Sequence, residues 1–194
     1  MHDHEDQRQT KRKRILSWII VILMVLSVAG FYVGSTGDGK TQRYNGIKFT
    51  STPRGVFAAI DGVRYGFTFF PSQVESIPAD PGVAALVRGP YLVVTYDPAS
   101  NHSQSMAAAQ YYLAEVLGSR NTYVQPAVTE DDSYNLPLLS CVNATATEPV
   151  LLLGEGDETS ITIKDSCITA AAAAGEDVLR IQDKILFIAL GVMD

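Results

Sequence analysis

The apolar residues of this chain form one long run near the N-terminus and shorter, patterned runs after it. Residues 15–34, ILSWIIVILMVLSVAGFYVG, contain no charged side chain. Twenty helical residues at about 1.5 Å each span the roughly 30 Å hydrocarbon core of a bilayer. The basic run KRKR at residues 11–14 precedes this segment. By the positive-inside rule, the pattern predicts a transmembrane helix over 15–34 with a cytoplasmic tail over 1–14.

A cleaved signal peptide is the alternative interpretation of the same segment. Ser27-Val28-Ala29 fits a small-x-small cleavage pattern that follows a basic region and an apolar region. The apolar run nevertheless continues through Phe31-Tyr32-Val33, and aromatic residues at that point are typical of a membrane anchor. Both interpretations place the rest of the chain outside the cytoplasm.

The chain after the apolar segment divides into a tether and one domain. Residues 35–43 are rich in Gly, Ser and Thr, a composition typical of a flexible linker. Residues 44–194 combine short β-rich runs with two longer helical patterns, in a length that suits one ordinary domain. We therefore expect one extracytoplasmic domain of the α/β (α+β) class, with an N-terminal β-meander, a mixed β-sheet and two main helices.

The first part of the domain is predicted to be the antiparallel meander. Residues 56–60 and 63–67 are β-rich runs on either side of Asp61-Gly62, a two-residue loop that favours the type I′ turn of a hairpin. With a further run around Phe49, residues 46–70 are expected to form three strands. Several prolines follow, and they limit the next stretch to a short helical turn near residues 73–77.

The second part is predicted to hold the mixed sheet and both helices. Tyr91–Tyr96 is typical of a buried strand, and a helix capped by Ser103 or Ser105 and running to Leu117 connects it to a strand over 122–128. An amphipathic pattern predicts the closing helix over 176–192, with Arg180, Asp183 and Lys184 outside its apolar stripe. The other runs assigned to the sheet are residues 136–139, 150–153, 161–163 and 168–170.

The cysteines agree with a location outside the cytoplasm. Cys141 and Cys167 are the only two in the chain, and both fall in the predicted domain. A disulfide between them is the expected pairing in an oxidising compartment, and two buried free thiols are the alternative. Asn101 and Asn143 each begin an Asn-x-Ser/Thr triplet, so they are candidate glycosylation sites of an exported protein.

Charge distinguishes the domain from the N-terminal segment. After residue 34 the chain carries ten Lys or Arg and eighteen Asp or Glu, whereas the first 34 residues carry five and three. An acidic domain repels nucleic acid and anionic lipid headgroups, and no basic patch is visible in the sequence. We therefore expect no nucleic-acid partner. The expected partners are the lipid bilayer, through the N-terminal helix, and an unknown protein at the cell surface.

A series of short stretches carries a resemblance to a known family. YNGIKF, the Asp61-Gly62 hairpin, FTFFPSQVESI, YLVVTYDP, LPLLSCVNAT, ITIKDSCI and a last helix ending in LGVM follow one another in this order. On these stretches, over most of residues 44–193, the chain resembles a family of small archaeal membrane-anchored proteins. The resemblance implies the fold and the anchoring. The family has no assigned activity, and its motifs are structural, so no catalytic residue is implied.

Candidate chemistry in the domain is sparse and centres on one carboxylate. Asp97 directly follows the buried strand, at the sheet edge where α/β proteins bind ligands, so it is the candidate ligand-binding residue. A turn or capping role before Pro98 is the alternative. A Ser/His/Asp triad would have to use His102 with Ser103 or Ser105, but the chain has no G-x-S-x-G motif. A surface histidine is the simpler interpretation.

The other polar clusters predict no metal and no cofactor. One histidine and two cysteines in the domain fall short of the four ligands that structural zinc requires, and His2 and His4 belong to a polar tail. Residues 130–132 and 155–158 are acidic, but their spacing matches neither an EF-hand nor a glycosidase pair. Gly154-Glu155-Gly156 lacks the lysine of a phosphate-binding loop.

The sequence as a whole favours a non-enzymatic cell-surface interaction or assembly module held at the cell membrane by its N-terminal helix. A membrane-anchored hydrolase or small-ligand-binding protein is the alternative, and a subunit whose membrane helix recognises a partner is a third possibility. A pocket containing Asp97 would favour ligand binding, whereas a broad apolar surface would favour an assembly module.

Overall fold

The computed structural model describes residues 18–24, 39–130 and 135–194, and the chain divides into two compact units, Met1–Gly39 and Lys40–Asp194. In the first unit, residues 18–24 are helical, and their apolar side chains are 49% to 71% exposed. In the described part of the chain, no helix is both long enough and apolar enough to cross a membrane. Most of the predicted span 15–34, and all of the predicted tail 1–14, lie outside the described residues.

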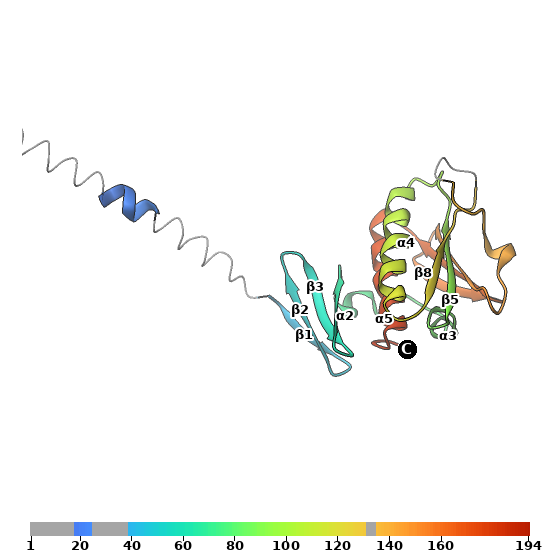
Figure 1. Ribbon diagram of the computed structural model, residues 1–194, viewed down its shortest axis with the longest axis horizontal. Coiled ribbons are helices and arrows are strands. Elements are labelled where there is room, and N and C mark those ends of the chain that lie inside the picture. The colour runs from blue at the N-terminus through green and yellow to red at the C-terminus, as the bar shows by residue number, and fades with distance from the viewer. Residues whose placement is uncertain (1–17, 25–38, 131–134) are drawn as a thin grey trace, which may run out of the picture. The chain divides into compact units, whose positions relative to one another are not determined.

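The second unit begins with a four-stranded antiparallel sheet in the order β1-β2-β3-β4 (Figure 1). Asp61 and Gly62 have φ values of 51° and 80°, as a type I′ turn requires, so the predicted hairpin is confirmed. Asn45 and Gly46, with φ values of 45° and 80°, make a similar turn one hairpin earlier. The meander therefore has four strands instead of three, and its first strand lies partly within the residues assigned to the tether. The strands are β1 Thr41–Tyr44, β2 Ile47–Thr52, β3 Gly55–Ile60 and β4 Val63–Phe67.

The second sheet is mixed and five-stranded, in the order β6-β5-β7-β9-β8. Neighbouring strands are parallel except β8, which runs antiparallel to β9 at one edge. The α+β class and the mixed sheet are thus confirmed, although the chain forms two sheets and residues 136–139 contribute only one isolated bridge, from Leu138 to Val128. The strands are β5 Tyr91–Tyr96, β6 Tyr123–Pro126, β7 Val150–Glu155, β8 Ser160–Lys164 and β9 Cys167–Ala172.

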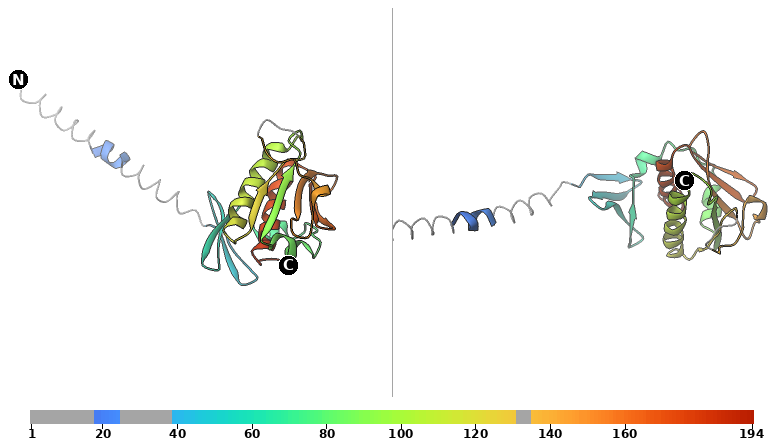
Figure 2. Two further views of the ribbon diagram at one scale, coloured as in Figure 1. Left: turned by 45° about the vertical axis from the view of Figure 1, so that its right-hand side comes forward. Right: turned by 90° about the horizontal axis from the view of Figure 1, so that it is seen from above.

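Two long helices lie between the two sheets, so the second unit has three layers (Figures 1 and 2). They are α4 Ser103–Gly118 and α5 Gly175–Ala189, which confirms the two predicted helices. His102 occupies the N-cap position of α4, so neither Ser103 nor Ser105 is the cap. The short helices are α2 Pro71–Val74, α3 Val83–Val87 and the 3-10 helix η1 Cys141–Asn143.

Helix α5 is buried on all sides because the meander, the mixed sheet and the helices α2, α3 and α4 all pack against it. Every residue from 181 to 188 is buried. Phe187 contacts the rings of Phe49 and Phe67 in the meander, with centroids 5.7 and 4.5 Å apart. The prediction of a single apolar stripe is therefore wrong for Asp183 and Lys184, whose exposed fractions are 0% and 7%. Arg180 is only partly buried.

The face of the mixed sheet that points away from the helices is covered by residues 136–149. Cys141 in this segment forms a disulfide with Cys167 at the start of β9, with an S–S distance of 2.03 Å. The predicted pairing is confirmed, and the alternative of free thiols is excluded. Thr95 Oγ1 donates to the carbonyl of Leu139 at 2.7 Å, and Val93 and Val150 pack beneath the segment. The disulfide thus fixes the cover to the sheet.

Candidate functional site

The candidate site lies at the carboxyl edge of the parallel strands. β5 and β7 are neighbours, with Tyr96 in register with Leu153. From β5 the chain passes through α4 to β6 on one side, whereas β7 and β9 lie on the other side of β5. In α/β sheets, ligands bind outside the carboxyl ends of strands at the place where the connections diverge in this way. The residues that follow β5 and β7 are therefore the first candidates.

Asp97 is the first residue after β5, and it shapes the loop that leads to α4. Its Oδ1 accepts a hydrogen bond from the backbone N–H of Ala99 at 2.8 Å. Its carbonyl accepts another from Ser100 N at 3.2 Å. The turn role that the sequence left as the alternative is thus present. Asp97 also lines a cavity, so the turn role leaves room for a ligand role.

Glu155 ends β7 and is joined to the same loop. Ser100 Oγ donates to Glu155 Oε1 at 2.5 Å, and it accepts a hydrogen bond from the backbone N–H of His102 at 3.0 Å. The hydrogen bond from Ser100 is the main reason why the pKa of Glu155 lies below its usual value, and the charge of His102 adds to the effect. The carboxylate of Glu155 is therefore ionised at neutral pH.

The His102 ring lies against the first residue of α5. A Cβ added to Gly175 would come within 3.1 Å of His102 Nδ1, so the ring rests where the glycine has no side chain. Among the hydrogen bonds of the described residues, none joins this ring to a serine hydroxyl; Ser100 donates to Glu155 instead. The arrangement that a Ser/His/Asp triad needs is not assembled at this edge.

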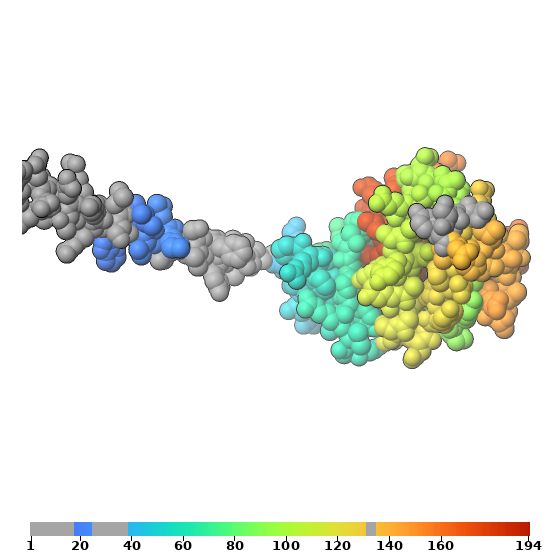
Figure 3. Space-filling model, turned by 45° about the horizontal axis from the view of Figure 1, so that its top comes forward, coloured from blue at the N-terminus to red at the C-terminus, as the bar shows by residue number. Residues whose placement is uncertain are grey.

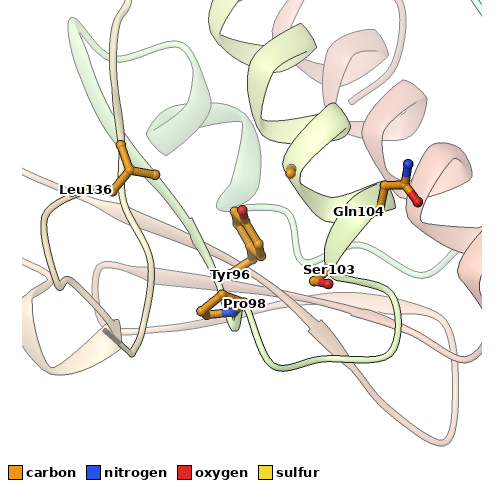
Figure 4. Close-up of a pocket in the computed structure, with 6 residues that line it drawn as sticks. Tyr96, Pro98, Ser103, Gln104 and Leu136 are labelled. Carbon is orange, nitrogen blue, oxygen red and sulfur yellow. The ribbon is translucent and has the colours of Figure 1, made fainter. Parts of the chain in front are cut away.

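Two cavities flank the loop that follows β5. The smaller measures about 320 Å³ and the larger about 600 Å³. Figure 4 shows the larger one, with Leu136 on one side, Ser103 and Gln104 from α4 on the other, and Tyr96 and Pro98 between them. The smaller cavity is lined mainly by polar groups, among them Asp97, Ser100, Asn101 and Glu155. The edge therefore places a polar cavity next to a more apolar one.

The loops at this edge are acidic. Residues 97–102, 155–159 and 173–177 contain no Lys or Arg. Asp177 accepts a hydrogen bond from Thr159 Oγ1 at 2.9 Å and lies 3.7 Å from the guanidinium of Arg180. An edge of this sign attracts cationic groups. The six carboxylates in these loops are Asp97, Glu155, Asp157, Glu158, Glu176 and Asp177.

Metal ligands do not converge in the described parts of the chain. Within residues 18–24, 39–130 and 135–194, no three His, Cys, Asp or Glu side chains are placed to hold a metal ion. His2, His4 and the acidic residues 131–132 lie outside the described residues.

Both candidate glycosylation sites lie on the surface of the unit. Asn101 is exposed in the loop that lines the smaller cavity. Asn143 is exposed at the end of η1, where its Oδ1 accepts a hydrogen bond from Ser140 N at 2.9 Å. A glycan on Asn101 would stand at the mouth of the cavity, and one on Asn143 would stand beside the disulfide. Modification at either residue stays a prediction.

Sequence reasoning singled out Asp97, considered Glu155 only as part of the acidic group 155–158, and missed Ser100. A signal for Glu155 was present, because it ends an apolar run in the same way that Asp97 ends Tyr91–Tyr96. The sequence did not reveal that β5 pairs with β7, because 53 residues, from 97 to 149, separate the two strands along the chain. Without that pairing, the two carboxylates cannot be assigned to one cavity.

Comparison of the chain with protein-family models, with curated proteins and with solved structures gives no match. The resemblance to small archaeal membrane-anchored proteins therefore stays a prediction. Geometry and charge at the carboxyl edge are the basis on which a function can be proposed.

Proposed function

We propose that this chain is a single-pass membrane-anchored protein whose Lys40–Asp194 unit lies outside the cytoplasm and acts as a non-enzymatic binding module. The uncharged run 15–34 after the basic run 11–14 supports the anchor and its orientation. The disulfide between Cys141 and Cys167 supports an oxidising compartment, because cytosolic thiols are kept reduced.

The observation that carries the binding role is the polar cavity that contains Asp97 and Glu155. Two carboxylates and the hydroxyl of Ser100 line it, and the loops around it hold no Lys or Arg. Such a cavity suits a small ligand with an amine or guanidinium group, which can donate to both carboxylates. The adjacent cavity, with Tyr96, Pro98 and Leu136, can accept an apolar portion of the same ligand.

An assembly module is the second candidate, and a separate observation favours it. Val142 is 91% exposed and Leu138 is 56% exposed, both on the segment that covers the mixed sheet. Exposed apolar side chains held on a cross-linked segment suit contact with another protein. Cross-linking and affinity purification of the full chain from native membranes separate the two candidates, because an assembly module recovers a partner in near-stoichiometric amount.

The ligand-binding proposal predicts the effect of removing one charge. For an amine ligand found by thermal-shift screening, we expect Glu155→Gln to weaken binding by roughly 10-fold to 100-fold, because a hydrogen bond to a charged group contributes about 1.5–3 kcal/mol. Calorimetry measures the affinity. Asp165→Asn, an exposed carboxylate in the β8–β9 turn, is the matched control and should leave affinity unchanged. Equal affinity in the natural chain, the Glu155→Gln variant and the Asp165→Asn variant would refute the site.

The anchoring proposal predicts the fate of the N-terminus. We expect the full chain to stay in native membranes after alkaline carbonate extraction, because 20 uncharged residues hold a helix in the hydrocarbon core. Mass spectrometry of the extracted protein should find peptides from residues before Ile15. A mature N-terminus at Gly30 would show a cleaved signal peptide and contradict the anchor.

A further inference from the structure

The basic residues of the second unit are concentrated in its first sheet. Residues 40–67 carry five Lys or Arg and one acidic residue, Asp61, whereas residues 68–194 carry five Lys or Arg and sixteen Asp or Glu. The domain is therefore acidic overall, but its meander carries a net positive charge. The sequence predicted no basic patch because the average over the domain was negative.

Strand register places three of these basic side chains in one row. Arg43 of β1 pairs with Lys48 of β2, and Ala59 of β3 pairs with Arg64 of β4. The pairing of Phe49 with Ala58 sets Lys48 beside Ala59 and completes the row across all four strands. Side chains alternate between the two faces of a sheet.

The basic row faces away from the core. The row next to it, which contains Phe49 and Tyr65, is buried against the helices, so the basic row lies on the opposite face. Arg43, Lys48 and Arg64 are all exposed. Figure 3 shows the β1–β4 sheet, in cyan and turquoise, at one end of the unit. We call the side of this sheet that carries Arg43, Lys48, Arg54, Phe57 and Arg64 the basic face.

An aromatic ring lies among the cations. The Arg64 guanidinium lies 4.4 Å from the centroid of the Phe57 ring. A Cβ added to Gly66 would come within 3.2 Å of Phe57 Cε1, so this glycine gives the ring room to lie across β4. Arg54, in the β2–β3 turn, lines a hollow of about 550 Å³ together with Phe57 and Arg64. Basic side chains around an aromatic ring are typical of a membrane–water interface.

The cations of the basic face have no carboxylate partner in the described part of the chain. The ion pairs there join Arg120 to Asp61 and Arg180 to Asp177. Arg43 and Lys48 are directly opposite each other, and like charges in that position destabilise a sheet. The fold gives no reason for this pair, whereas an anionic surface outside the protein would neutralise it.

We propose that the basic face binds the anionic headgroups of the membrane in which the protein is anchored. The face is broad and spans four strands, which suits a lipid surface better than a single small anion. Between the end of the predicted span at Gly34 and the start of β1 at Thr41 lie six residues, which reach at most about 20 Å. The inference rests on the proposed anchor, because that short connection keeps the sheet close to the headgroups.

The test uses the Lys40–Asp194 unit without the predicted span. All buried core residues of the described chain belong to this unit, so it carries its own hydrophobic core. We expect it to sediment with vesicles of phosphatidylcholine and phosphatidylglycerol and to dissociate from them as the salt concentration is raised. It should not bind vesicles of phosphatidylcholine alone. The triple substitution Arg43→Gln, Lys48→Gln and Arg64→Gln should weaken vesicle binding about 100-fold, at roughly fivefold for each side chain.

The matched control makes the same change in net charge outside the meander. Lys164→Glu and Arg180→Gln together should leave vesicle binding within about twofold of the natural unit, since screening limits the range of a charge to about 10 Å. A loss in this control equal to that of the triple variant would show a net-charge effect and overturn the proposal. So would the absence of binding to anionic vesicles, or tighter binding to duplex DNA than to vesicles.

Two further experiments distinguish a lipid surface from a free anion and test the anchor separately. Inorganic phosphate at roughly 10 mM should not displace the unit from vesicles if the whole face meets an array of headgroups. Displacement would assign the hollow beside Arg54 and Arg64 to a free anion and overturn the membrane assignment. Carbonate extraction of the full chain tests the anchor independently, so failure of one experiment is distinguishable from failure of the other.

Discussion

An Asp183→Asn variant is expected to gain about 2 kcal/mol of unfolding free energy, relative to the natural chain, as the pH rises from 4 to 7. Asp183 is fully buried, and burial raises the pKa of its carboxyl from 3.8 to about 6. A group whose pKa is higher in the folded state stabilises the fold below its unfolded pKa. That stability is lost as the pH rises through the folded value. Asparagine does not ionise, so it loses nothing over this range.

The hydrogen bonds of Asp183 allow the amide to replace the carboxyl. Asp183 Oδ2 accepts from the backbone N–H groups of Thr68 and Phe69, both at 2.7 Å, and Gln182 donates to Oδ1 at 3.3 Å. The amide oxygen of asparagine can accept both backbone bonds. Tyr112 of α4 is the titratable neighbour; burial raises the pKa of its hydroxyl, and the charge of Asp183 adds to the effect. Tyrosine does not titrate between pH 4 and 7.

Urea unfolding of both proteins at several pH values measures this effect. The difference between the two curves removes the contributions of the other carboxylates, which both proteins share. An Asp165→Asn variant, changed at an exposed turn, is the control and should stay parallel to the natural chain. If the Asp183→Asn curve also stayed parallel, burial would not be raising the pKa of Asp183.

Loss of the disulfide is the second large effect that we expect. The Cys141→Ser, Cys167→Ser double variant should unfold with about 3 kcal/mol less free energy, because the cross-link closes a loop of 26 residues in the unfolded chain. Without the disulfide, the cover over Val93 and Val150 is held by weaker contacts such as the Thr95 to Leu139 hydrogen bond. Denaturant titration with and without reductant measures the loss.

Reductant provides the control for this prediction. It should lower the stability of the natural chain to that of the double variant and leave the double variant unchanged. A natural chain that is equally stable with and without reductant would show that the cross-link does not constrain the unfolded state to this extent.

Local signals were sufficient for the elements whose geometry depends on adjacent residues. Asp61-Gly62 specifies its hairpin because a type I′ turn needs two positive φ values. Asn45-Gly46 carries the same signal, and recognising it would have given the fourth strand. Tyr91–Tyr96 and Ser103–Gly118 were found because an apolar run and a helical period persist over enough residues to be distinctive.

Features that depend on the pairing of distant segments were not predictable. Asp183 falls outside the apolar stripe of α5, and it is buried because the segment after β4 and helix α4 pack against that side. Asp97 and Glu155 share a cavity through the pairing of β5 with β7, and Arg43, Lys48 and Arg64 share a row through the register of four strands. A sequence shows the members of each group but not which ones become neighbours.

The position of α5 between the two sheets has a consequence for how the protein matures. Phe49 and Phe67, near the start of the second unit, complete their packing only against Phe187, near its end. Contacts so far apart in sequence form slowly. While the chain is still being synthesised, the aromatic face of the meander has no helix to cover it. We therefore expect folding to finish only after α5 has been released, with a chaperone shielding that face in the interval.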